Sequence, residues 1–378
     1  MRTQFRDHRH SFVTALVLFA SLSLASSASA APLGGADIPA VKATPEPHSI
    51  DQQIRLANDY FAGHGVVQNF QQSAYWFEKA ASSGDAQAQM QIGYLYDAGI
   101  GVSKDPERAA QWYQLAAAGG LATAKANLGI LYFWGNGVKK DERMAAQLFR
   151  EAAQKGSGLA ACYLGNLYAL GAGVPQDMSE SERWYARGAA MHNPQAEYAL
   201  GMLLFDRQDH VHDLPRAATL LRESAATGDV PAMFALGLLL ARNPALAKSS
   251  GEATALLNDA ANAGIWKSSM ILGVLARDGN SVPLDPAAAY YHFRVAALQG
   301  GTEAENLLQA DIRKLSSGLS PDQMASLDSK AENWYQQHRI VLEFVSKGGE
   351  NRTRFPDYAL AVPQNGSHSV QMLPDQLN

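Results

Sequence analysis

Residues 86–120 read AQAQMQIGYLYDAGIGVSKDPERAAQWYQLAAAGG, and related stretches recur along the chain every 36 residues. One phase of this period is glycine at residues 84, 120, 156, 228, 264 and 300. A second phase is occupied by Gly93, Gly129, Gly165, Gly201, Gly237 and Gly273. A period between about 20 and 50 residues is typical of a solenoid, in which each unit is stabilised mainly by its neighbours. The sequence therefore predicts about seven stacked copies of one unit and an extended binding surface.

The first half of the unit predicts an α-helix with one apolar face. Ala88, Ile92 and Leu95 fall at helical spacing, and Gly93 leaves room for a second helix to approach closely. A pair of glycines follows, which suits a left-handed helix exit and a tight turn. The pairs are Gly63/Gly65, Gly99/Gly101, Gly135/Gly137 and Gly171/Gly173. Repeats five and six lack such a pair.

The second half of the unit predicts another helix, which starts at a fixed N-cap position. An Asn, Asp or Ser side chain there can accept a hydrogen bond from a free amide of the first turn. The expected N-caps are Asn69, Asp105, Asp141, Asp177, Asp213, Ser249 and Asp285. We expect this helix to bury Trp112, Tyr113 and their equivalents, and to end at the 36-spaced glycine.

The unit resembles the Sel1-like repeat, a relative of the tetratricopeptide repeat. The family pattern, approximately A-x-x-x-L-G-x-x-Y-x-x-G-x-G-V followed by D, W and A-A-x-x-G, is met closely by residues 88–120. The resemblance covers about residues 51–300. It implies an all-α fold, a right-handed α-solenoid of about seven 36-residue helix-pair repeats with the first helices lining its concave side. It also implies a protein-interaction or adaptor role.

The chain divides into five expected segments. Residues 1–30 combine a basic start, an apolar run at Phe12–Leu24 and a small-residue site, which is typical of a secretory signal peptide cleaved between Ala30 and Ala31. The other segments are a flexible linker at 31–49, the repeat solenoid at 50–300, a C-terminal capping helix pair at 301–340 and a disordered tail at 341–378. We therefore expect a periplasmic or secreted protein without stable membrane insertion. An uncleaved anchor is the alternative.

Charge and cysteine content exclude several classes of function. The chain carries a formal charge of −5, which becomes −7 once the three Arg and one Asp of residues 1–30 are removed. No basic region indicates nucleic-acid binding. Cys162 is the only cysteine, so no intrachain disulfide can form. This departs from the cysteine-rich branch of the Sel1-like family and weakens the case for the penicillin binding associated with that branch.

Sequence motifs favour a binding protein over an enzyme. The chain has no S-x-x-K, G-x-S-x-G or H-E-x-x-H motif, and G-N-G-V-K-K at Gly135 resembles a phosphate loop only superficially because its glycine pair recurs as a turn. We expect no cofactor. The hypothesis is an exported scaffold or adaptor for a partner protein or peptide in envelope assembly, exopolysaccharide export, signalling or secretion. The alternative is a peptidoglycan- or penicillin-binding protein, or a cell-wall hydrolase.

Variation between the repeats indicates where a partner would bind. Two positions of the first helix vary in type, and in related repeats this face lines the concave groove. The candidate groove residues are Tyr94, Ile130, Phe133, Trp134, Met202, Phe205 and Leu238. Exposed apolar patches with aromatic anchors commonly mark partner sites. The alternative is that these side chains pack between adjacent first helices.

Repeat five carries the one concentration of potential metal ligands. Its loop reads FDRQDHVHDLP, with Asp209, His210 and His212 in a short span. Histidine and carboxylate groups can bind zinc or another divalent ion. Asp213 is already explained as an N-cap, and no second group of ligands accompanies the loop. We therefore expect no metal site and keep these three residues as weak candidates.

Overall fold

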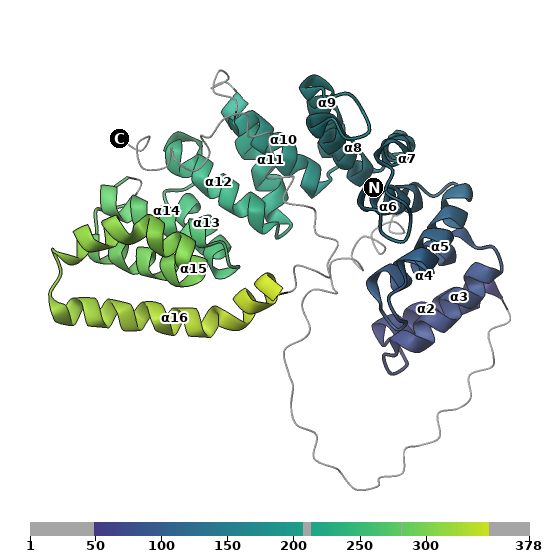
Figure 1. Cartoon of the computed structure of the whole chain (residues 1–378), viewed down its shortest axis with the longest axis horizontal. Coiled ribbons are helices and arrows are strands. Elements are labelled where there is room, and N and C mark those ends of the chain that lie inside the picture. Colours follow the sequence, from purple (N-terminus) through teal and green to yellow (C-terminus); the bar gives the residue numbers. More distant parts are fainter. Residues whose placement is uncertain (1–48, 207–212, 281, 348–378) are drawn as a thin grey trace, which may run out of the picture. The chain divides into compact units, whose positions relative to one another are not determined.

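The computed structural model describes residues 49–206, 213–280 and 282–347, with the side chains described as far as residue 338. Every regular element in these ranges is a helix (Figure 1). The helices form seven pairs and a final helix, which confirms the predicted helix-pair solenoid. In repeats one to seven the pairs are α2 Ile50–Ala62 with α3 Phe70–Ser82, α4 Ala86–Ala98 with α5 Pro106–Ala118, α6 Ala122–Trp134 with α7 Glu142–Gln154, α8 Gly158–Leu170 with α9 Met178–Ala189, α10 Pro194–Asp206 with α11 Leu214–Ala226, α12 Val230–Arg242 with α13 Glu252–Asn262, and α14 Trp266–Asp278 with α15 Pro286–Ser316.

Six of the seven pairs are held together where a large side chain meets a glycine; the first pair has Ala57 at this position. A Cβ atom added to Gly93 would lie 2.8 Å from the Tyr113 ring, and one added to Gly129 would lie 2.7 Å from the Phe149 ring. Tyr113 and Phe149 are almost completely buried. The preceding position, expected to be buried as well, is only partly so at Trp112. The close approach of the two helices therefore depends on the residue that follows the tryptophan.

The predicted N-caps are confirmed in five of the seven repeats. In each, a side-chain oxygen accepts a hydrogen bond from an amide of the first turn, at 2.9–3.0 Å. These residues are Asn69, Asp105, Asp141, Asp177 and Asp285. In repeat five the position is as predicted but the cap bond is absent, and in repeat six the prediction is wrong. Asp213 lies in a helical conformation without a side-chain cap bond, and in repeat six a short 3-10 turn, Pro244–Leu246, delays the helix so that Gly251 replaces Ser249 as N-cap.

In repeats two to four, the two glycines of the loop have different roles. The first, as in Gly99, ends the helix in the left-handed conformation. The second packs against the start of the preceding second helix, where a methyl group would overlap a backbone carbonyl. The overlaps are Gly101 with Phe70, Gly137 with Pro106, and Gly173 with Glu142. The second glycine therefore joins one repeat to the next.

Two further helical segments follow the seventh repeat at the C-terminal end of the stack. α15 contains a break at Gly301, with φ 58° and ψ −144°, so its second half corresponds to the expected first helix of a capping pair. α16, Pro321–Lys347, packs against it and continues past residue 340, the expected end of the capping segment. Asp328 of α16 accepts hydrogen bonds from Arg294 at 2.7 Å and from the Tyr290 hydroxyl at 3.1 Å. The expected signal peptide and nearly all of the linker and tail lie outside the described residues.

Buried apolar side chains form three clusters along the stack. Two of them lie within the first four repeats, one around Tyr113 and the other around Phe149. A single larger cluster runs from Cys162 to Leu308 through repeats five, six and seven. In this part the first helices also contact each other directly, because α10 touches both α8 and α12, and α12 touches α14. None of the helices described is both long and apolar enough to span a membrane.

Candidate protein-binding surface

The seven candidate groove residues all lie on first helices, but their exposure differs. Phe133 is buried, whereas Trp134 at the end of α6 is 43% exposed. The other five are partly buried and pack against a core cluster: Tyr94, Ile130, Met202, Phe205 and Leu238. For Tyr94, burial is the main cause of a raised phenol pKa, with a smaller contribution from Asp97. Trp134 is therefore the most exposed of the seven candidates.

The environment of Trp134 is aromatic and basic. Its ring meets Phe133 edge to face, with centroids 4.9 Å apart and an interplanar angle of 80°. The Lys140 ammonium group lies 5.9 Å from the centroid of the Phe133 ring, near the outer limit of a cation–π contact. Lys139 and Arg143 follow in the same stretch of chain. We call Phe133, Trp134, Lys139, Lys140 and Arg143 the aromatic–basic surface.

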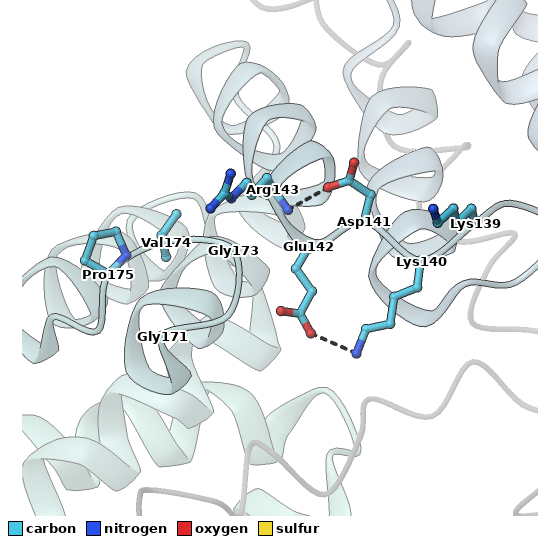
Figure 2. Close-up of a pocket in the computed structure, with 9 residues that line it drawn as sticks. All are labelled: Lys139, Lys140, Asp141, Glu142, Arg143, Gly171, Gly173, Val174 and Pro175. Atoms are coloured by element: carbon cyan, nitrogen blue, oxygen red, sulfur yellow. Dashed lines mark hydrogen bonds and ion pairs between the residues drawn. The ribbon is translucent and has the colours of Figure 1, made fainter.

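A shallow open pocket continues this surface across the boundary between repeats three and four (Figure 2). Its volume is about 930 Å³. One wall is the start of α7, from Lys139 to Arg143, and the other is the glycine loop of repeat four. The loop contributes Gly171, Gly173, Val174 and Pro175. We call this space the junction pocket. It exists because Gly173 brings the loop against the carbonyl of Glu142.

The carboxylates of the junction pocket are already engaged. Asp141 accepts hydrogen bonds from the amides of Arg143 at 3.0 Å and Met144 at 2.9 Å. Glu142 forms an ion pair with Lys140 at 2.8 Å. Figure 2 shows these two side chains meeting on one side of the chain, while Arg143 extends away from them. Within the described residues, neither Lys139 nor Arg143 has a carboxylate at ion-pair distance.

The concentration of positive charge is confined to one of three equivalent junctions. The second glycine packs on the preceding helix in the same way at Gly101, Gly137 and Gly173. The positions that match Lys139, Lys140 and Arg143 hold Val67, Gln68 and Gln71 at the first junction, and Ser103, Lys104 and Glu107 at the second. The cations of the third junction are therefore not required by the shared fold. Comparing charge across repeats in the sequence could have found this site.

The weak metal candidates cannot be placed. Asp209, His210 and His212 lie outside the described residues. Among the residues that are described, no group of three or more His, Cys, Asp or Glu side chains is arranged to hold a metal ion. Cys162 is buried, and burial raises the pKa of its thiol to about 12. A thiol with so high a pKa is a poor nucleophile, which fits a packing residue.

Comparison with known proteins identifies the repeat. The Sel1 repeat model matches residues 53–85, 86–121, 122–157, 158–193, 194–229 and 268–301. The chain belongs to the Sel1 repeat family. The match omits residues 230–267, which include the whole of repeat six, but the structure contains the α12–α13 pair there, so this repeat lacks the glycine loop and keeps the helices.

A solved structure of a Sel1 repeat protein agrees with this assignment, and two further solved structures show weaker similarity. A Sel1 repeat protein from Oxalobacter formigenes is 30% identical, with 64% of this chain and 98% of that chain aligned and a TM-score of 0.55. A protective antigen of uropathogenic Escherichia coli is 21% identical, with 81% and 80% aligned and a TM-score of 0.39. An immunity protein from Pseudomonas aeruginosa is 22% identical, with 64% and 88% aligned and a TM-score of 0.32. No curated protein matches the chain.

Membership of the family indicates a broad role. Sel1 repeats generally mediate protein–protein interaction, which is consistent with a scaffold role for this chain. The family consists mainly of scaffolds without enzymatic activity. The partner and the binding surface have to be argued from the residues of this chain.

Proposed function

We propose that this Sel1 repeat protein is an exported adaptor that binds a partner protein or peptide through the aromatic–basic surface. The observation that carries the proposal is that repeat three exposes both Trp134, at the end of α6, and the cations of the junction pocket, at the start of α7. Tryptophan and arginine are enriched among the residues that dominate binding energy, and such residues lie in or beside pockets. Trp134 and Arg143 both belong to repeat three, one at the end of its first helix and the other at the start of its second helix.

The proposed export rests on the sequence of residues 1–30. Their basic start, apolar run and Ala-Ser-Ala ending favour cleavage after Ala30. Cell fractionation followed by N-terminal sequencing of the purified protein tests this point. We expect a periplasmic or secreted protein that begins at Ala31. Recovery of the intact N-terminus in the cytoplasmic fraction would contradict it.

The proposed binding is tested by crosslinking in cells and affinity capture of the full chain. The decisive variant is Trp134→Ala, because it removes an exposed ring and little of the core. Tyr94→Ala is less suitable, since Tyr94 packs against the core. The matched control is Leu115→Ala on the second helix α5, where the leucine is 52% exposed. We expect a captured partner to be lost with Trp134→Ala and retained with Leu115→Ala.

Other outcomes of the capture experiment would redirect the proposal. A partner retained by both variants would contradict the proposed surface and leave an adaptor that uses another face. Absence of any partner would contradict the adaptor role. Binding to purified peptidoglycan would then be the next assay, because the cell-wall function is the competing hypothesis.

A further inference from the structure

The charges of the junction pocket indicate which kind of partner it accepts. We propose that the pocket binds an acidic peptide segment, with a carboxylate between Lys139 and Arg143 and an apolar side chain of the same segment against Trp134. This inference rests on the proposed function and specifies the chemistry of the partner.

The cations of the pocket exceed what its own carboxylates neutralise. Asp141 is occupied as the N-cap of α7, and Glu142 pairs with Lys140. Arg143 and Lys139 lack a carboxylate partner among the described residues, and both are exposed. A guanidinium group can donate two parallel hydrogen bonds to one carboxylate, which gives direction as well as attraction. Arg143 is therefore the residue best suited to orient an acidic side chain.

The charge of the whole chain favours a peptide over a larger polyanion. The chain carries −5, so a nucleic acid or an anionic membrane would be repelled by most of its surface. At physiological salt, charge interactions extend only about 8 Å. An acidic segment in the pocket therefore responds mainly to the charges of the pocket itself. The pocket volume, about 930 Å³, is also within the range of small binding clefts.

The repeats supply substitutions that the fold already accepts at this position. The variant Lys139→Ser, Lys140→Gln and Arg143→Gln introduces the residues found at equivalent positions of the first two junctions, where Ser103, Gln68 and Gln71 stand. Glutamine also keeps the Cβ contact that Lys140 makes beside Gly135. The matched control is Lys104→Gln, which removes one cation at the neighbouring junction. Circular dichroism and thermal unfolding check that both variants are folded.

The experiment is a selection of random dodecapeptides displayed on phage, with the purified full chain as bait. Selected peptides are then synthesised and their affinities measured by fluorescence anisotropy. We expect them to be enriched in Asp and Glu and to bind wild type and Lys104→Gln equally. Affinity should fall at least about tenfold for the triple variant, because several charge-assisted contacts are lost. Trp134→Ala should weaken the same peptides, and added salt should weaken their binding to the wild type.

The possible failures are distinguishable. Selected peptides without acidic enrichment, or acidic peptides that bind the triple variant as well as the wild type, would overturn the acidic-peptide inference and leave the adaptor role intact. If the wild type selects no peptide at all, both the inference and peptide binding by the adaptor are contradicted.

Discussion

The first four repeats and the last three are joined in different ways. At the three junctions of the first four repeats, the second glycine of each loop packs on a carbonyl of the preceding helix, at Gly101, Gly137 and Gly173. Repeats five and six lack the glycine pair, and there α10 and α12 contact each other and their neighbouring first helices. One apolar cluster begins on α8 and α9 of repeat four and continues through the last three repeats, whereas two smaller clusters form the rest of the core of the first four repeats.

This difference shows that the 36-residue period and the way neighbours are joined are separate properties. Helix pairing depends on the glycine that faces a large side chain, and it continues with Gly201 against Leu221 and Gly237 against Leu257. Loop packing depends on the second glycine of the pair, which repeats five and six have lost. The loop-packed part carries the junction pocket.

The largest expected loss of stability comes from truncating a large buried side chain to alanine in each region. Phe149 is fully buried and stacks on Tyr163 at 4.9 Å, so Phe149→Ala should lower the free energy of unfolding by about 3–5 kcal/mol. Leu257→Ala in the continuous cluster should cost about 2–5 kcal/mol. Urea unfolding measures both. Hydrogen exchange should show loss of protection confined to α6–α8 for Phe149→Ala and spread over α10–α15 for Leu257→Ala. The same pattern for both variants would remove the distinction between the regions.

One added methyl group should destabilise the contact between the second glycine of a loop and the preceding helix. Gly101→Ala combines the strain of a left-handed φ, roughly 1–2 kcal/mol, with an overlap on the Phe70 carbonyl that adds about 1–3 kcal/mol. Gly84→Ala is the control, since its φ is also positive and no other atom lies within 4 Å of the added methyl group. Thermal and urea unfolding should show the larger loss for Gly101→Ala. Equal losses would mean that the loop contact does not stabilise the junction.

Acidification should lower the stability of the C-terminal end, because the fold holds His292 in its neutral form. Burial and nearby Lys330 lower the pKa of this imidazole to about 4, against the smaller opposite influence of Asp285. As pH falls below about 6.5, the unfolded chain takes up the proton first, so stability is lost down to about pH 4. We expect a loss of about 1–2 kcal/mol near pH 5. His292→Asn should remove this loss.

Urea unfolding of both proteins across this pH range checks the sign. The difference between wild type and His292→Asn is the quantity to compare, because the raised carboxyl pKa values of Asp97, Glu197 and Asp229 act in the opposite direction. An unchanged difference from neutral to acid pH would show that His292 is not held neutral.

The smallest expected effect is the loss of stability when an N-cap side chain is removed. It should differ between a residue that makes the cap hydrogen bond and one that does not. Asp105 accepts a hydrogen bond from the Arg108 amide at 3.0 Å, so Asp105→Ala should cost about 1 kcal/mol. Asp213 makes no cap bond, and Asp213→Ala should change stability by at most about 0.5 kcal/mol. Urea unfolding of the two variants compares them directly. If Asp213→Ala lowered the free energy of unfolding as much as Asp105→Ala, Asp213 would be shown to cap α11 as the sequence predicts.

The sequence predicts the helix pairs because their causes are local and repeated. Gly93 and Tyr113 recur at fixed phases, and an N-cap such as Asp105 needs only the amides of its own first turn. The same logic fails at Asp213, whose backbone is helical, and at Ser249, which follows a 3-10 turn and precedes the actual N-cap Gly251. A cap residue can act only if the loop delivers it in an extended conformation.

The binding surface was harder to predict because it depends on distant contacts. The sequence favours a left-handed turn at Gly101, but it does not show that the glycine touches Phe70, which lies in the previous repeat. The candidate groove residues include Trp134, which is exposed, and Phe133, which is buried. Variation of a position between repeats does not distinguish exposed side chains from side chains packed between helices. The junction pocket needs two repeats to exist, so neither repeat alone indicates it.

The central claim is that the boundary between repeats three and four contacts a partner in the cell. Its most direct test replaces Trp134 with a photo-crosslinking phenylalanine analogue in the full chain, with the same analogue at Leu115 as the control. The account predicts a specific crosslinked adduct from position 134, loss of that adduct when Lys139, Lys140 and Arg143 are neutralised, and none from position 115. An adduct from position 115 without one from position 134 would contradict it.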